Sequence, residues 1–330
     1  MLSQNSSSSF YRKGISGANS VEVVEQILLK DSWRNREIPL KVYYPQEEGI
    51  FPLIIFSHGA GGSKDSFSYL SHFWASCGYV CIHPTHLGSD VSVLQKIGLQ
   101  ALLEVTNDPE LYAERPHDIS FIIDSLGEIE QQIPQLTGKI AHDVIAVSGH
   151  SYGAYTTMLL AGSVIEMAVG EEESFQDDRI GFFLGISPQG TNRLGLTKHS
   201  WDKIKAPMML VSGSKDQGWE GKPASWRMEA FNYMPPGNKY HLLVEGANHF
   251  SFDLQPKIAK NIGLKTKRQN AVREKQLSEF DQNSRIKIYL KSATIAFWDA
   301  YLKRKSSGKE YLWSDTLKID SNGEVELYLK

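Results

Sequence analysis

The sequence predicts an α/β protein with a mostly parallel central sheet and helices on both faces of that sheet. Short, continuous apolar runs, each the length of a strand, alternate with segments of helical composition. Strands that are buried on both faces have this pattern, because crossover helices cover a parallel sheet. The chain has 330 residues, of which 41% are hydrophobic and 22% are charged, enough apolar material for one large domain with insertions.

The predicted elements can be placed in order along the chain. Residues 1–20 are rich in serine and glycine, and we expect them to form a flexible tail. Two strand-like runs, Val21–Leu29 and Ile38–Tyr44, predict an antiparallel edge with a turn near Asn35. The following apolar runs predict the buried strands Phe51–Ser57, Tyr79–His83, Val144–Ser148, Gly181–Ser187, Pro207–Ser212 and Tyr240–Val244. An amphipathic helix is expected over Ile286–Leu302.

Three segments extend beyond what this sheet needs, namely residues 87–115, the acidic residues 169–179 and residues 250–285. Residues 87–115 and 250–285 follow the carboxyl ends of predicted strands and are far longer than a usual connection of about 2–6 residues. We expect these two insertions to cover a pocket at that end of the sheet. The main domain is expected to span residues 21–302. Residues 303–330 are expected to form a C-terminal β-hairpin extension that turns at Asn322-Gly323.

The charge balance and the two cysteines exclude several classes of protein. The 35 Lys and Arg residues nearly cancel the 38 Asp and Glu residues, and the net charge of −3 argues against nucleic acid as a partner. The longest apolar runs are far shorter than the ~20 residues of a membrane-spanning helix. The first residues lack the pattern of a signal peptide. Because Cys77 and Cys81 are predicted to be free thiols, we expect a cytoplasmic protein.

The most informative motif is the run from Gly149 to Gly153, which reads Gly-His-Ser-Tyr-Gly. The predicted buried strand Val144–Ser148 leads into it, and a segment of good helix formers leaves it. This is the setting of a nucleophile elbow, in which a sharp strand-to-helix turn presents a serine and needs glycine neighbours. Ser151 is therefore the candidate nucleophile.

A serine hydroxyl reacts only when a neighbouring base takes its proton. In a parallel sheet, such a base is expected after the carboxyl end of the last parallel strand. His241 begins that strand, whereas His249 follows it, so His249 is the candidate base. The base needs a carboxylate to orient it. Residues 181–200 contain no Asp or Glu, and the loop after the next strand supplies Asp216 as the candidate acid.

Two backbone N–H groups are candidates for an oxyanion hole, which stabilises the negative oxygen formed during acyl transfer. One belongs to Tyr152, directly after the candidate nucleophile. The other belongs to Ala60, in the glycine-rich loop that follows Phe51–Ser57. His58, at the start of this loop, is expected to be a structural hydrogen-bonding residue.

Aromatic and histidine side chains near the candidate triad are candidates for a substrate pocket. These are Trp219, Trp226, Phe250 and His86. His83 and His86 could suggest a metal pair, but no Cys, Asp or Glu joins them at ligand spacing. We therefore expect no metal site.

Together these motifs resemble the α/β-hydrolase superfamily, and within it the bacterial esterases described as dienelactone-hydrolase-like or platelet-activating-factor-acetylhydrolase-like. The resemblance covers about Val21 to Leu302. It rests on Phe56–Gly62, His83-Pro84, His86–Ser89, Arg115–Asp118, the serine motif, Ile186–Gly190 and Met234–Lys239. It implies an α/β-hydrolase fold and a serine-hydrolase mechanism. Dienelactone hydrolases carry a cysteine where this chain has Ser151, and the acetylhydrolases take their acid one strand earlier, so neither substrate is implied.

The sequence thus predicts a serine hydrolase that cleaves carboxylic esters through an acyl-enzyme intermediate. The expected substrate is a small-molecule ester with an apolar acyl group, and no cofactor is expected. Two alternatives remain open. The same triad would serve an amidase or peptidase, and a protein with this fold could bind ligands without catalysis.

Overall fold

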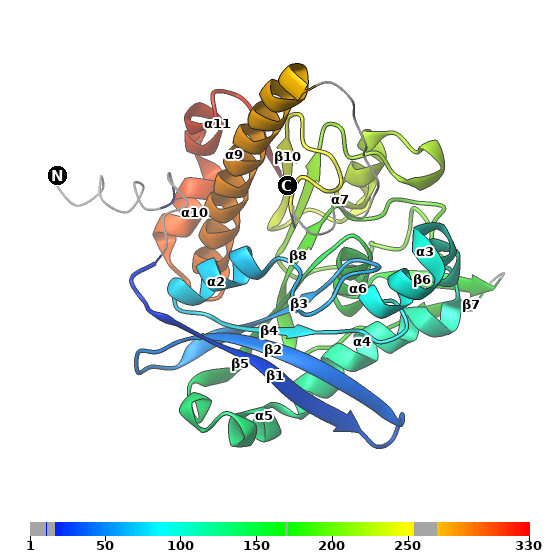
Figure 1. Ribbon diagram of the computed structural model, residues 1–330, viewed down its shortest axis with the longest axis vertical. Coiled ribbons are helices and arrows are strands. Elements are labelled where there is room, and N and C mark those ends of the chain that lie inside the picture. The colour runs from blue at the N-terminus through cyan, green and yellow to red at the C-terminus, as the bar shows by residue number, and fades with distance from the viewer. Residues whose placement is uncertain (1–10, 12–16, 169–170, 254–268) are drawn as a thin grey trace.

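The computed structural model describes residue 11 and residues 17–168, 171–253 and 269–330 (Figure 1). Within these residues, the central sheet has nine strands in the order β1-β2-β4-β3-β5-β8-β9-β10-β11. They are β1 (Val21–Asp31), β2 (Arg36–Pro45), β3 (Phe51–Ser57), β4 (Val80–Pro84), β5 (Ile140–His150), β8 (Ile180–Ile186), β9 (Met208–Gly213), β10 (Lys239–Val244) and β11 (Val325–Leu329). The six strands from β4 to β10 in this order are parallel, and β1, β2 and β11 pair antiparallel at the two edges.

This architecture is the α/β fold class that the apolar runs predict. The predicted strand Phe51–Ser57 coincides with β3, and the other buried runs end within one or two residues of the observed strands. β5 begins four residues earlier than predicted, at Ile140 rather than Val144. Its first part pairs with Phe51 and Pro52 across an irregularity in register and carries exposed side chains. A half-exposed strand end lacks the continuous apolar pattern that marks the buried part.

Helices cover both faces of the sheet (Figure 1). One face is covered by α4 (Pro109–Asp124), α5 (Leu126–Gln132) and α6 (Tyr152–Leu160), and the other by α2 (Ser68–Ser76), α9 (Gln269–Tyr301), α10 (Ser306–Trp313) and α11 (Thr316–Asp320). The remaining elements include α3 (Val91–Val105), α7 (Glu229–Tyr233) and a separate hairpin of β6 (Val164–Ala168) and β7 (Glu171–Ser174). Two hydrophobic cores result, one on each side of the sheet, as expected when helices bury both faces.

The C-terminal hairpin predicted for residues 303–330 is wrong. Two short helices, α10 and α11, come before Asn322 and Gly323, and only β11 follows them, as an edge strand on β10. Both turn residues have the left-handed backbone that a hairpin turn needs, with φ of 52° and 79°. They end a helix instead, because the Gly323 N–H donates to the carbonyl of Lys318. Residues with a left-handed backbone occur both in hairpin turns and at helix ends, so the Asn-Gly signal alone could not distinguish these two structures.

The predicted N-terminal tail is held against the domain where the structure describes it. Residues 1–10 and 12–16 lie outside the described residues. Tyr11 is 2% exposed, and its hydroxyl donates to Asp299 on α9. The N–H of Gly17 and the side-chain amide of Asn19 both donate to Ser76 at the end of α2. The expectation of a flexible tail is therefore wrong at these positions.

The two predicted insertions form helices in the described part of the chain. Residues 87–115 contain α3 and the start of α4, and α3 is broken at Gly98, whose φ of 80° and ψ of 170° are not helical. In the insertion 250–285, residues 254–268 lie outside the described residues. Residues 269–285 belong to α9, which therefore begins well before the predicted start at Ile286.

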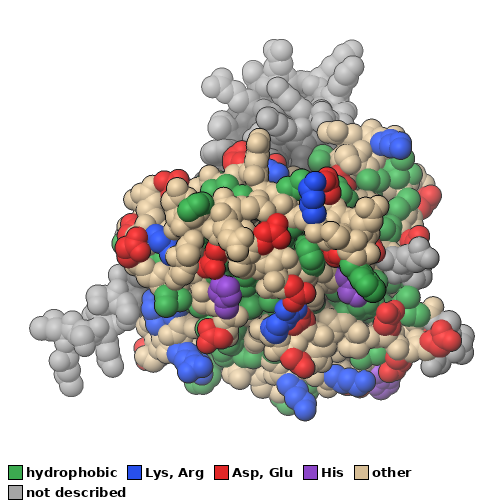
Figure 2. Space-filling model, turned by 90° about the horizontal axis from the view of Figure 1, so that it is seen from below, with side chains coloured by type: hydrophobic (Ala, Val, Ile, Leu, Met, Phe, Trp, Pro, Cys, Tyr) green, Lys and Arg blue, Asp and Glu red, His purple; other side chains and the backbone are tan. Residues whose placement is uncertain are grey.

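The surface agrees with the small net charge. On the face seen in Figure 2, the Lys and Arg side chains are interspersed with Asp and Glu. Among the helices of the described residues, none is long and apolar enough to cross a membrane.

Candidate active site

A strained turn presents Ser151 between β5 and α6. Its φ of 55° and ψ of −115° form a backbone conformation that residues other than glycine rarely adopt. Two glycines make the turn possible. A Cβ on Gly149 would lie 2.3 Å from the carbonyl oxygen of Gly153, and a Cβ on Gly153 would lie 1.9 Å from that of Ser57. The turn therefore places Ser151 at the carboxyl end of the sheet and at the N-terminus of α6.

The structure brings the three predicted triad residues together. Nε2 of His249 lies 3.0 Å from Oγ of Ser151, and Nδ1 of His249 lies 3.0 Å from Oδ1 of Asp216. Asp216 follows β9 and His249 follows β10, so parallel strands deliver their loops to one edge. If Nδ1–H donates to the carboxylate, Nε2 is left as the acceptor for the serine hydroxyl. The Asp216 side chain is fully buried, whereas that of His249 is 13% exposed.

A buried arginine that sequence reasoning missed binds the same carboxylate. Arg227 is 1% exposed and donates from Nε to Oδ1 of Asp216 at 3.1 Å. Its terminal nitrogens donate to the backbone carbonyls of Ser187, Pro188 and Gln217. Burial alone would raise the pKa of Asp216, but the hydrogen bond from His249 and the charge of Arg227 lower it. Asp216 is therefore a stable anion, held by a cation that also ties together the loops after β8 and β9.

A second histidine supports the loop that carries His249. His150 precedes Ser151, and its Nε2–H donates to the backbone carbonyl of His249 at 3.1 Å. The two imidazole rings pack with their centroids 4.9 Å apart. Burial lowers the pKa of His150 to about 3, so its ring is neutral at physiological pH. The sequence marked this position only as part of the serine motif.

Of the two predicted oxyanion-hole donors, Tyr152 directly follows Ser151 in the chain, and Ala60 directly follows a residue that approaches Ser151. Tyr152 is the first residue of α6, so its N–H has no acceptor within the helix. Within the described residues, the N–H of Ala60 donates to no protein acceptor. The neighbouring Gly59 approaches the serine so closely that a Cβ on it would lie 3.4 Å from Cβ of Ser151. Both N–H groups can therefore serve an oxygen bound beside Ser151.

Two of the four predicted pocket residues are accessible. Trp219 is 38% exposed and borders a cavity of about 500 Å³. The rest of the lining is Leu99, Gln100, Leu103, Glu104, Asn107 and Arg193. Phe250 is 49% exposed, and its ring meets the His249 ring edge-on with a centroid separation of 5.4 Å. One wall of the cavity thus comes from α3, in the predicted insertion 87–115.

The assignment of Trp226 and His86 to the pocket is wrong. Trp226 is 4% exposed, and its Nε1–H donates to the carbonyl of Thr191, so it packs under the site. His86 is fully buried and lies between Ser57 and Asp118. Both side chains therefore form hydrogen bonds inside the protein and do not line the pocket. Among the residues that the structure describes, no group of three His, Cys, Asp or Glu side chains could hold a metal ion.

The fold and the geometry around Ser151 together define a class of protein. A mostly parallel sheet that presents a serine at a strand-to-helix turn, with an acid and a histidine on later loops, is that of the α/β-hydrolases. The model of the family described as Chlorophyllase matches residues 7–171, which is half of the 330 residues. The chain belongs to this family. The matched part contains the Ala60 loop and Ser151 and ends before Asp216 and His249.

Two mammalian proteins are similar to a larger part of the chain. The platelet-activating factor acetylhydrolase of Canis lupus familiaris is 22% identical over 232 residues, and that of Bos taurus is 22% identical over 234 residues. Each match covers 61% of this chain and 48% of the relative. The chain thus spans about half the length of these curated relatives.

Proposed function

We propose that this protein is a serine hydrolase that cleaves carboxylic esters. The observation that carries the proposal is the placement of His249 between Ser151 and Asp216, at 3.0 Å from each. This is the order of atoms in which a histidine acts as general base on a serine hydroxyl. The family match and the two relatives named acetylhydrolases support a hydrolase that acts on esters.

In the proposed reaction, Oγ of Ser151 attacks the ester carbonyl carbon while Nε2 of His249 takes the hydroxyl proton. The carbonyl oxygen becomes negative and accepts hydrogen bonds from the N–H groups of Ala60 and Tyr152. When the bond to the alcohol breaks, the imidazolium returns its proton to the leaving oxygen, which leaves an acyl-Ser151 ester. Water then repeats these steps, releases the acid and restores the serine. Asp216 stabilises the imidazolium throughout.

We also propose that the cavity between α3 and Trp219 receives the apolar part of a small-molecule ester. Leu99, Leu103 and Trp219 give it apolar walls. α3 also contacts the oxyanion-hole loop, because a Cβ on Gly61 would lie 2.9 Å from Leu94. α3 would therefore connect the substrate pocket to the reacting centre.

We further propose a cytoplasmic location for the protein. Cys77 and Cys81 are free thiols, which supports this proposal.

A fluorophosphonate probe tests the proposed nucleophile. We expect one phosphonyl group per chain, located on the peptide that contains Ser151 by mass spectrometry, and no labelling of Ser151→Ala. When p-nitrophenyl esters and p-nitroanilides with the same acyl group are compared, we expect the esters to be hydrolysed faster. Labelling at another residue, or equal labelling of Ser151→Ala, would reject the proposal.

A further inference from the structure

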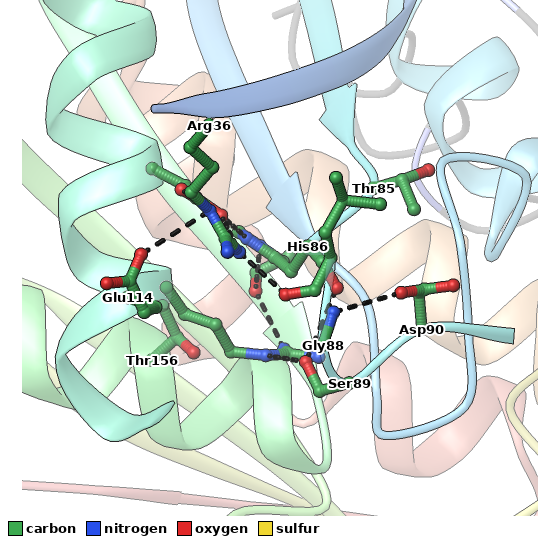
Figure 3. A network of polar contacts seen from close by, with 12 residues as sticks. Arg36, Thr85, His86, Gly88, Ser89, Asp90, Glu114 and Thr156 are labelled. Carbon is green, nitrogen blue, oxygen red and sulfur yellow. Dashed lines mark hydrogen bonds and ion pairs between the residues drawn. The ribbon is translucent and has the colours of Figure 1, made fainter. Parts of the chain in front are cut away.

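A cluster of buried polar side chains lies beneath the loop that carries Ala60. Its members are the buried residues Ser57, His58, His86, Arg115 and Asp118 and the half-buried Arg36, and we call it the buried polar cluster. They come from β2, β3, the loop after β3, the loop after β4, and α4. Figure 3 shows Arg36 and Glu114 joined by an ion pair beside His86. Ser57, His58, His86, Arg115 and Asp118 are each at most 1% exposed. None of them can reach a substrate, yet several contact the backbone of the active-site loop.

The protonation state of the cluster follows from its contacts. Nδ1 of His86 lies 2.9 Å from Asp118, and Nε2 of His86 lies 3.0 Å from Oγ of Ser57. Burial would raise the pKa of Asp118, but the hydrogen bond from His86 and the charge of Arg36 lower it to about 2. Burial and the charge of Arg115 lower the pKa of His86 to about 4. His86 is therefore neutral, donates from Nδ1–H to the carboxylate and accepts from the serine hydroxyl.

The tautomer of His58 is also determined by its neighbours. The backbone N–H of His86 donates to Nε2 of His58 at 3.0 Å, so Nε2 carries no proton. Burial and the charge of Arg115 hold the pKa of His58 well below its usual range, so the ring is neutral. Its single proton must be on Nδ1, which lies 2.7 Å from the carbonyl oxygen of Gly59. His58 is thus a fixed donor to that oxygen.

The carbonyl of Gly59 and the N–H of Ala60 belong to one peptide group. In a planar trans peptide, the C=O and N–H bonds point in opposite directions. The Gly59 oxygen is held from two sides, by Nδ1–H of His58 and by the N–H of Gly62 at 3.0 Å. Fixing this oxygen toward the cluster therefore turns the Ala60 N–H away from the cluster.

Arg115 links the cluster to both halves of the proposed oxyanion hole. It donates to the backbone carbonyl of His58 at 2.6 Å and to Oγ of Ser89 at 3.0 Å. Its guanidinium also lies over the Tyr152 ring, 4.3 Å from the ring centroid. The Ser89 carbonyl in turn accepts from the N–H of Gly61. One buried cation thus holds the loop around Ala60 and the residue that supplies the second N–H.

We propose that His58 is a positioning residue that aims the N–H of Ala60 at the transition-state oxygen, and that the buried polar cluster exists to fix the tautomer in which it does so. This inference rests on the proposed esterase function. His58 touches no substrate and transfers no proton. It acts only through the orientation of the Gly59–Ala60 peptide.

Two variants test separately the two hydrogen bonds of the His58 ring, the one that Nδ1–H donates to Gly59 and the one that Nε2 accepts from His86. The amide of His58→Asn can place an N–H where Nδ1 lies, and so keeps the bond to Gly59. The amide of His58→Gln reaches the Nε2 position and keeps an acceptor for His86, but leaves the Gly59 oxygen without this donor. Removing an oxyanion-hole donor outright costs about 10²–10³-fold in kcat, and misaiming one should cost less. We expect kcat of His58→Gln to fall about 10- to 100-fold with KM unchanged, and kcat of His58→Asn to stay within about threefold of wild type.

A transition-state analogue distinguishes this role from a loss of stability. A trifluoromethyl ketone that adds to Ser151 places its oxyanion in the hole, so its affinity should fall in His58→Gln by the same factor as kcat/KM. His241→Gln is the matched control, because His241 is also a fully buried histidine, and its hydrogen bond goes to Oγ of Ser212 at 2.8 Å rather than to the Ala60 loop. It should lower Tm without changing kcat or the affinity for the ketone.

Several results would overturn the role of His58. One is an active wild type with an equally active His58→Gln, which would leave the proposed function intact. Another is an equal loss of kcat in both His58 variants with unchanged affinity for the ketone. The tautomer of His58 can also be measured by NMR in the wild-type protein, so this test does not depend on the folding of any variant. A ¹⁵N spectrum that shows His58 with its proton on Nε2 would also exclude the role, whereas an Nδ1 proton supports it. An inactive, unlabelled wild type would overturn the proposed function and this role together.

Discussion

Asp216 orients His249 through an oxygen that it shares with Arg227. Oδ1 accepts both the hydrogen bond from Nδ1 of His249 and the one from Nε of Arg227. An asparagine at this position would keep one oxygen for both bonds while losing the negative charge. The substitution Asp216→Asn therefore isolates the contribution of the charge to the stability of the imidazolium.

We expect Asp216→Asn to lower kcat for p-nitrophenyl esters by at least about 10²-fold, and Ser151→Ala by about 10³-fold or more. Because the triad acts as one unit, the double variant should be no worse than Ser151→Ala alone. Asp202→Asn is the control, since Asp202 pairs with an exposed histidine, His199, on the surface. Additive losses in the double variant would show that Asp216 acts outside the triad.

At the scale of elements, the junction of β5 and α6 depends on the missing side chain of Gly153. A Cβ there would meet the carbonyl oxygen of Ser57 at 1.9 Å, and neither backbone can move without disturbing the sheet. We expect Gly153→Ala to unfold the elbow or abolish activity, with a large loss in Tm. Gly127→Ala on α5 is the matched control, because a Cβ at Gly127 meets nothing within 4 Å. It should stabilise by roughly 0.5–1 kcal/mol. Equal Tm values for the two variants would contradict this account.

The cavity wall formed by α3 gives a separate prediction about substrate preference. Leu99 and Leu103 line the cavity, whereas Ile97 on the same helix does not line it. Leu99→Ala with Leu103→Ala should shift the preference among p-nitrophenyl esters toward longer acyl chains, because the cavity grows. The rate of labelling by a small fluorophosphonate should change little. Ile97→Ala should leave both the acyl preference and the labelling rate unchanged. An unaltered acyl preference in the double variant would mean that the acyl group does not bind in this cavity.

The elements that the sequence predicts well are those whose signal is local. Phe51–Ser57 is apolar throughout because β3 is buried on both faces, and the glycines around Ser151 reflect a steric need within the turn itself. The C-terminal segment was predicted wrongly because Asn322 and Gly323 suit either a hairpin or a helix end, and only packing on β10 decides. Arg227 and the burial of His86 left no local signal. Their partners lie on other elements, so only the folded chain brings them together.

For the molecule as a whole, histidine burial is the largest source of pH-dependent stability that we find in the described residues. His58, His83, His86 and His241 are at most 1% exposed. Burial lowers the pKa of His83 and His241 to about 3 and that of His86 to about 4, and that of His58 well below its usual range. Burial also lowers the pKa of His150 to about 3. All five rings are therefore neutral in the folded protein, where they hold serine hydroxyls and loop backbones.

These neutral histidines make the folded protein less stable as the pH falls. Below pH 6.5, an unfolded histidine takes up a proton and these five folded ones do not, so the unfolded state binds more protons and gains stability as pH falls. Five protons correspond to a slope of up to about 7 kcal/mol per pH unit near pH 5. Asp253 opposes this, because burial raises its pKa to about 6 and the folded state then binds one extra proton between about pH 4 and 6. Asp118, with a pKa of about 2, adds to the loss only below about pH 4.

The free energy of unfolding, measured with urea at a series of pH values, should therefore be nearly constant around pH 7 and fall steeply below 6.5. Folded domains are stable by about 5–15 kcal/mol, so this slope should unfold the protein between about pH 5 and 4. His241→Gln removes one of the five neutral rings and should reduce the slope by about 1.4 kcal/mol per pH unit. His199→Gln, at a side chain that is 83% exposed, should leave the slope unchanged. A free energy of unfolding that stays level from pH 6.5 to 5 would mean that the buried histidines accept protons within the folded protein, and that the hydrogen bonds assigned to their neutral rings are wrong.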